Sequence, residues 1–65
     1  MRILINQQPH DCPEGATLAD AIALLRPGGP FAAAVNAVFV PRSRYALHPL
    51  QDGDRVEVIA PVTGG

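Results

Sequence analysis

Residues 50–65 read LQDGDRVEVIAPVTGG, and this stretch contains the strongest signals for the fold. The Asp-Gly-Asp sequence at 52–54 is typical of a tight turn, because aspartate side chains accept hydrogen bonds from nearby amides and glycine tolerates a positive φ. Residues 55–59 then alternate charged and apolar side chains around Val56 and Val58, the pattern of a strand with one buried face. We therefore expect a final strand over 55–59, preceded by a tight turn.

The last five residues, 61–65, end on Gly64 and Gly65 and have the composition of a tail. Glycine has no side chain to pack and loses more conformational entropy on ordering than any other residue. We therefore expect residues 1–65 to form a single domain in which 61–65 are a flexible C-terminal tail.

The composition is that of one small packed domain. Of the 65 residues, 48% are hydrophobic and 17% are charged, which argues against a disordered segment. The net charge of -1 gives no electrostatic basis for binding nucleic acid. Arg42 and Arg44 form the only local basic pair. They are either solvated surface arginines or a contact for an acidic partner surface.

Cellular location and redox chemistry follow from what the chain contains. The single cysteine, Cys12, has no internal partner for a disulfide, and neither a signal peptide nor a membrane-length apolar run is evident. We therefore expect a cytoplasmic protein without membrane association. A free cysteine is usually a small buried hydrophobe, although a part for Cys12 in sulfur transfer is the alternative. With His10 and His48 it is too oddly spaced for a structural zinc site, so we expect no metal.

Upstream of the final strand, the sequence predicts a hairpin and then a helix. Residues 2–6 and 10–13 are its expected strands, separated by the Gln-Gln-Pro break at 7–9. Thr17 and Asp20 have the spacing of a capping box. The apolar residues that recur at helical spacing after this cap are Leu18, Ile22 and Leu25.

The second half of the chain reads as short strands separated by turns. The Pro-Gly-Gly-Pro sequence at 27–30 ends the helix. Residues 31–36 and 38–40 predict two strands, and 42–47 predict a turn or a single helical coil. Since each layer alone would leave its apolar side in water, the order of elements favours an α+β fold, a mixed sheet with one main helix packed across one face.

Alternation along the outer strands assigns side chains to the two sheet faces. The residues expected to face the helix are Ile3, Ile5, Val56 and Val58, and those expected on the opposite face are Leu4, Glu57 and Ile59. Two apolar residues on an open face are either ordinary surface aliphatics or a platform for a partner.

The assembled pattern resembles the ubiquitin-like β-grasp sulfur carriers, and among them the ThiS family. The likeness covers the whole chain and rests on the sequences Val-Asn at 35–36, Val-Pro-Arg at 40–42, residues 50–57 and the Gly-Gly end. Tyr45 stands where many relatives have tryptophan. The Pro-Val sequence at 61–62 is similar to the tail of the MoaD family, the sulfur carriers of molybdopterin synthesis.

The resemblance implies a sulfur carrier in thiamine (thiazole) biosynthesis, a protein co-substrate and not an enzyme. A ThiF-type adenylyltransferase would use ATP to adenylate the C-terminal carboxylate of Gly65, and a persulfide sulfur donor would convert it to a thiocarboxylate. A ThiG-type thiazole synthase would then take the sulfur. Gly64 and Gly65 would let the tail thread into a narrow channel. No cofactor would be bound by this chain, which would be a monomer when free.

Partner contacts are expected at Leu4, Ile59 and Val62. Three alternatives remain open: a MoaD-like small subunit of molybdopterin synthase, a ubiquitin-like modifier joined to other proteins through an isopeptide bond, and an interaction module with an incidental Gly-Gly end. MoaD-like relatives usually run longer than 65 residues, which favours the thiazole pathway.

Overall fold

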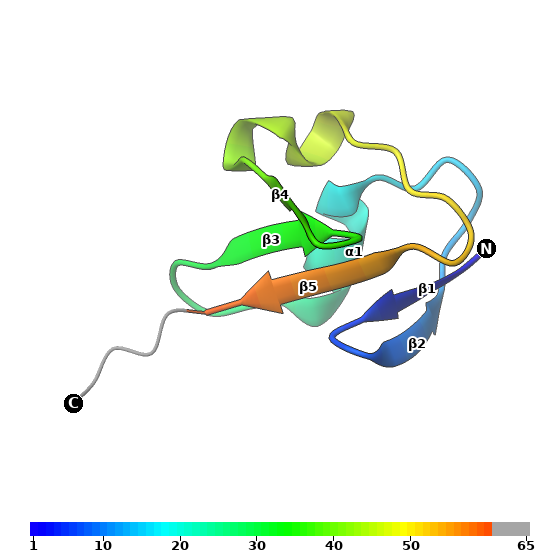
Figure 1. Cartoon of the computed structure of the whole chain (residues 1–65), viewed down its shortest axis with the longest axis horizontal. Coiled ribbons are helices and arrows are strands. Elements are labelled where there is room, and N and C mark those ends of the chain that lie inside the picture. The colour runs from blue at the N-terminus through cyan, green and yellow to red at the C-terminus, as the bar shows by residue number, and fades with distance from the viewer. Residues whose placement is uncertain (61–65) are drawn as a thin grey trace.

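A five-stranded mixed sheet with one α-helix across one face makes up the part of the chain that the computed structural model describes, residues 1–60 (Figure 1). The elements in chain order are β1 (Arg2–Ile5), β2 (Gln8–Asp11), α1 (Leu18–Leu25), β3 (Ala32–Val35), β4 (Val38–Val40), the 3₁₀ helix η1 (Arg42–Leu47) and β5 (Arg55–Ile59). In space the strands follow the order β2-β1-β5-β3-β4. β5 is parallel to β1, and the other neighbours are antiparallel. The predicted α+β architecture is confirmed.

The turn before β5 ties the last strand to the first. The Asp52 carboxylate accepts a hydrogen bond from the Arg2 amide at 2.7 Å, and the Gly53 amide donates to the Arg2 carbonyl at 2.7 Å. Gly53 has φ +89, a backbone conformation that glycine adopts without strain. Asp54 accepts from the Gln51 amide at 2.8 Å. These bonds explain why an Asp-Gly-Asp sequence stands here, and they start β5 beside β1.

Both β-hairpins turn through two residues of positive φ, Asn6-Gln7 (φ 50 and 70) and Asn36-Ala37 (φ 51 and 68). Two left-handed residues in succession make the type I′ turn, whose twist matches that of the flanking strands. Asparagine tolerates this conformation better than most side chains, which accounts for its place at the head of each turn.

The predicted position of the first turn, at 7–9, is wrong. β2 begins at Gln8 and ends at Asp11, so Pro9 lies inside the strand and not in the turn. Proline is accepted there because β2 is an edge strand, where the missing N–H is not needed for pairing within the sheet.

Helix α1 starts at the predicted capping box. The Thr17 hydroxyl accepts from the Asp20 amide at 3.4 Å, and the Asp20 carboxylate accepts from the Thr17 amide at 2.9 Å. The prediction for Leu25 is wrong: it is 37% exposed, whereas Ala21 is fully buried. Leu25 is the last residue of a helix of two turns, where fewer neighbours cover a side chain, and the small Ala21 lets the helix approach the sheet closely.

The core between sheet and helix is almost entirely aliphatic. The four strand residues predicted to face the helix are all buried, Ile3, Ile5, Val56 and Val58, and they pack with Leu18, Ala21 and Ile22 of α1. Cys12 is also buried in this cluster. Beside it, Tyr45 of η1 stacks on Phe31 with ring centroids 5.9 Å apart. The helix thus covers the inner face of the sheet and leaves the outer face open.

Candidate functional site

The end of β5 is the last element of the described chain before the C-terminal segment. β5 runs in the middle of the sheet, and Ile59, its last residue, is 58% exposed on the outer face. The next residue, Ala60, is the last one described. The predicted site residues Val62, Gly64 and Gly65 lie outside the described residues, so their roles remain predictions.

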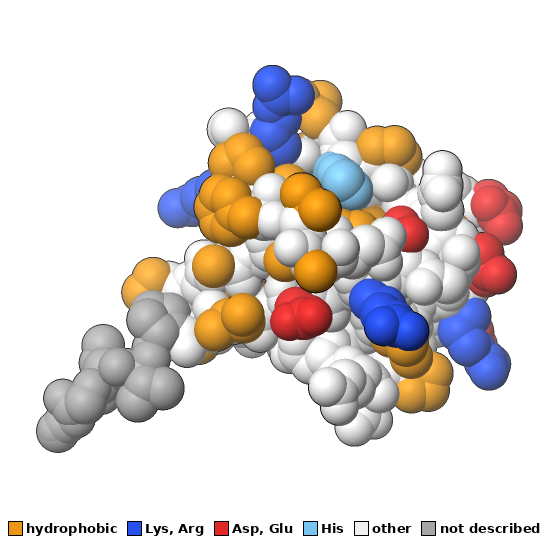
Figure 2. Space-filling view, in the orientation of Figure 1, with side chains coloured by type: hydrophobic (Ala, Val, Ile, Leu, Met, Phe, Trp, Pro, Cys, Tyr) orange, Lys and Arg blue, Asp and Glu red, His pale blue; other side chains and the backbone are white. Residues whose placement is uncertain are grey.

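A small apolar patch extends from this point across β3 and β4 on the outer face. We define the outer patch as Ala32, Ala34, Phe39 and Ile59. Ala32 pairs with Ile59, and Ala34 pairs with Phe39, which is 66% exposed. Alanines on β3 keep the patch shallow between the two large side chains. Figure 2 shows hydrophobic groups gathered over this side of the sheet, with an acidic group beside them.

Leu4 lies apart from the outer patch. It is on the predicted face but half-buried, and it pairs with Arg55, four residues before Ile59 along β5. At about 3.3 Å per residue, the backbone positions at Arg55 and Ile59 are about 13 Å apart. The side chains of Arg55 and Glu57 lie between Leu4 and Ile59. With Gln7 they line a separate depression of about 280 Å³ around Leu4. The two predicted contact residues therefore share a face without forming one continuous patch.

Asn6 fixes the end of β5 from the side of β1. Its side-chain oxygen accepts from the Val58 amide at 2.9 Å, and its side-chain amide donates to the Val58 carbonyl at 3.2 Å. The β1–β5 ladder has ended by this point, so the asparagine side chain continues it by one further pair of bonds. Asn36 holds the start of β5 in a similar way, because its side-chain oxygen accepts a hydrogen bond from the Arg55 amide at 3.0 Å. Sequence reasoning did not identify either role.

A second group of exposed apolar side chains was not predicted. Val38 is 66% and Leu47 is 72% exposed, and with Phe39 they border the edge formed by β4 and η1. The sequence signal for them was the Val-Phe-Val run itself, which is too short to show which of its side chains are covered. The burial of a side chain depends on which elements pack beside its strand, and β4 is an edge strand of the sheet.

The described residues hold neither a candidate metal cluster nor a membrane span. Within residues 1–60, no three His, Cys, Asp or Glu side chains are grouped closely enough to hold an ion. The same part of the chain has no helix of the length and hydropathy needed to cross a bilayer.

Comparison with known proteins places these features in a family. The model of the ThiS family matches residues 3–65. The sulfur carrier protein ThiS of Escherichia coli (strain K12) is 37% identical over 67 residues, an alignment that covers 100% of both chains. The chain belongs to the ThiS family.

Solved structures agree at the level of the ThiS fold. A crystal structure of the thiamine biosynthesis protein ThiS from Geobacter metallireducens superposes with a TM-score of 0.81 at 20% identity, and both chains are covered completely. A solution structure of a thiamine biosynthesis protein from the same organism gives a TM-score of 0.78 at 22% identity, covering 100% of this chain and 88% of the other. The predicted family and the predicted β-grasp fold are confirmed.

Proposed function

We propose that this protein is a sulfur carrier of thiamine biosynthesis, in which the C-terminal carboxylate of Gly65 receives, holds and delivers the sulfur. The observation that carries the proposal is the full-length similarity to the sulfur carrier protein ThiS of Escherichia coli. The family match extends to Gly65, the residue that would supply the reacting group.

The chemistry follows from the weakness of a carboxylate as an electrophile. A Gly65 carboxylate oxygen attacks the α-phosphate of ATP on a ThiF-type partner, so that pyrophosphate leaves and an acyl adenylate forms. The terminal sulfur of a persulfide then attacks the acyl carbon and AMP leaves, which gives an acyl disulfide. A thiol cleaves its S–S bond, is itself oxidised to a disulfide, and leaves the thiocarboxylate on Gly65. A ThiG-type thiazole synthase would consume this sulfur.

In this reaction the folded domain binds the partner enzymes and does not itself catalyse a step. The outer patch is the surface we propose for partner contact, because it includes Ile59, the last residue of the strand that precedes the C-terminal segment. The six residues 60–65 that follow Ile59 could span at most about 21 Å when extended. A partner must therefore bind near Ile59 if its ATP site is to receive Gly65. Thiols and ATP are both cytosolic, so we place the cycle in the cytoplasm.

The experiment that tests the pathway compares two acceptor enzymes. The thiocarboxylate form is prepared and offered either to a thiazole synthase with its other substrates or to the large subunit of a molybdopterin synthase with its precursor. We expect thiazole formation and no molybdopterin. Rescue of molybdopterin formation alone would show that the pathway is wrong, and transfer to neither enzyme would contradict the carrier function.

A further inference from the structure

The two edges of the sheet differ in whether another strand can pair with them. Backbone groups of the even-numbered β3 residues point toward β5, as shown by the bond from the Asn36 amide to the Arg55 carbonyl at 2.8 Å. The odd-numbered residues of β3 therefore bond to Val38 and Val40. Phe39 lies between these two, so its N–H and C=O point away from the sheet at the open edge of β4.

The same reasoning gives the opposite result at the other edge. The Leu4 amide bonds to Asp54 and the Asn6 amide bonds to Val56, so even-numbered residues of β1 point toward β5. Pro9 pairs with Leu4 and hence faces the open edge of β2. It has no N–H to offer there. Pro9 and Phe39 are both the second residue after a two-residue asparagine turn, so equivalent positions are blocked in β2 and open in β4.

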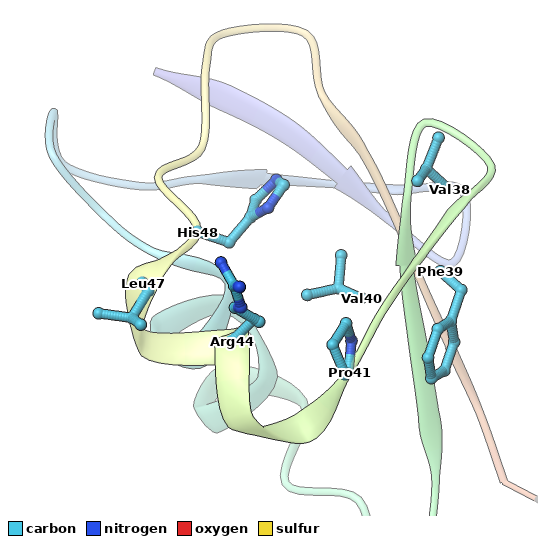
Figure 3. Close-up of a pocket in the computed structure, with 7 residues that line it drawn as sticks. All are labelled: Val38, Phe39, Val40, Pro41, Arg44, Leu47 and His48. Carbon is cyan, nitrogen blue, oxygen red and sulfur yellow. The ribbon is translucent and has the colours of Figure 1, made fainter.

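A groove runs beside the open edge. It has a volume of about 380 Å³ and lies between β4 and η1, with Val38 and Val40 on one wall and Arg44, Leu47 and His48 on the other. Figure 3 shows the nitrogen-bearing end of Arg44 directed toward His48 in the space between the two elements. A strand added to β4 would lie about 4.8 Å from it, within this groove.

The groove carries a single formal charge, which is positive. Among the described residues that line it, Arg44 is the one charged side chain, and none of them is a carboxylate. Among residues 1–60, the only arginine in a salt bridge is Arg2, so Arg44 is free to pair with an incoming acid. Figure 2 shows basic groups over the η1 corner, with the acidic groups of this view placed elsewhere.

We infer that β4 is a strand-addition site for an extended segment of a partner protein that carries an acidic side chain. The segment bonds through its backbone to the N–H and C=O of Phe39. Alternate side chains enter the groove, where apolar ones contact Val38, Val40 and Leu47 and the acid pairs with Arg44. This is a mode of peptide recognition in which backbone bonds supply affinity and the groove supplies selectivity. The site is separate from the C-terminal carboxylate and does not rest on the sulfur-carrier function.

A second copy of this chain is a poor occupant of the same edge. Two β4 strands paired about Phe39 would each present Arg44 and no carboxylate from the groove, so neither copy would supply an opposite charge. A contact based on a strand of three residues would also bury far less than the roughly 1,200 Å² of a stable interface. An acidic segment supplies the missing opposite charge.

The probe is the capped peptide acetyl-VTVTDT-amide, titrated to millimolar concentration into ¹⁵N-labelled full-length protein. Its two valines and the aspartate lie on one side of an extended strand. We expect amide shifts at Val38, Phe39 and Val40 and saturable binding. The asparagine version, acetyl-VTVTNT-amide, should bind about two- to fivefold more weakly, as expected for loss of one exposed charge pair. A version N-methylated at alternate amides should not bind.

Protein variants assign the contacts. Phe39→Pro removes the outward N–H as Pro9 does in β2, and we expect it to raise the Kd at least about tenfold. Phe39→Ala keeps the N–H and should cost less. Arg44→Gln should abolish the preference for the aspartate peptide over the asparagine peptide. Arg55 is exposed and does not line the groove, so the control Arg55→Gln should preserve that preference.

Three results would overturn the inference. One is binding of the N-methylated peptide with the same Kd as acetyl-VTVTDT-amide. This test does not depend on whether Phe39→Pro folds. Another is the absence of shifts at β4 at millimolar peptide. The third is concentration-dependent dimerisation of the free protein with the same β4 shifts, since the occupant would then be a second copy.

Discussion

Replacing Asn6 by alanine should loosen the end of β5, from which the C-terminal segment departs. The change removes two hydrogen bonds to the Val58 backbone, at 2.9 and 3.2 Å, and Val58 itself is only 8% exposed. Together these bonds contribute about 1–2 kcal/mol. Asn6 also has φ 50, where alanine is strained by about 1 kcal/mol. We therefore expect a loss of about 2–3 kcal/mol in the free energy of unfolding.

Two further substitutions separate these contributions. Asn6→Gly loses the bonds without the strain, so it should be less destabilising than Asn6→Ala by about 1 kcal/mol. Asn6→Asp keeps an acceptor for the Val58 amide but places a carboxylate against the Val58 carbonyl, so it should retain only part of the stability.

The assay is urea unfolding combined with amide hydrogen exchange. The Val58 amide should exchange faster in each Asn6 variant by more than global unfolding explains. The Leu50 amide, bonded to the Ala16 carbonyl at 2.9 Å, reports global opening as the control. A cost below about 0.5 kcal/mol for Asn6→Ala, or equal changes in exchange at Val58 and Leu50, would refute the claim that Asn6 pins the end of β5.

Three other predictions follow from the helix and the outer face. Ile22→Ala should destabilise the protein by about 2–5 kcal/mol in urea unfolding, whereas Leu25→Ala should cost much less; equal costs would contradict the observed burial. Thr17→Ala should cost about 0.5–2 kcal/mol and lower the Tm, and an unchanged Tm would show that the capping box is not stabilising. Ile59→Arg should weaken binding to a ThiF-type enzyme in a pull-down titration more than Leu4→Arg does, since only Ile59 belongs to the outer patch; the reverse order would move the contact surface toward Leu4.

The elements set by local chemistry could be predicted from the sequence. The Thr17 capping box, the turn at 52–54 and the final strand each have a recognisable pattern within a few consecutive residues, and all three are found as expected. Family membership was also accessible, because the features that identify it occur in order along the whole chain.

Features that depend on distant parts of the chain were missed. Pro9 looked like a turn residue, and only its place at a sheet edge explains why it fits within a strand. The alternating pattern placed Leu4 and Ile59 on one face but could not give their separation along β5, which requires the strand register. Phe39 is exposed because it lies on the outer face, away from α1, and the side of the sheet that the helix covers is a property of the fold that the Val-Phe-Val sequence does not contain.

The measurement that tests the sulfur-carrier function most directly is the intact mass of the protein after incubation with a ThiF-type enzyme, ATP, a persulfide donor and a thiol. We expect the mass to rise by the replacement of one oxygen with sulfur, located by fragmentation to Gly65. A variant lacking Gly65 should fold normally but show no such gain, because its carboxylate is displaced by one residue. Sulfur acquired at the C-terminus of that variant, or an intact protein that gains no sulfur, would contradict the proposed chemistry.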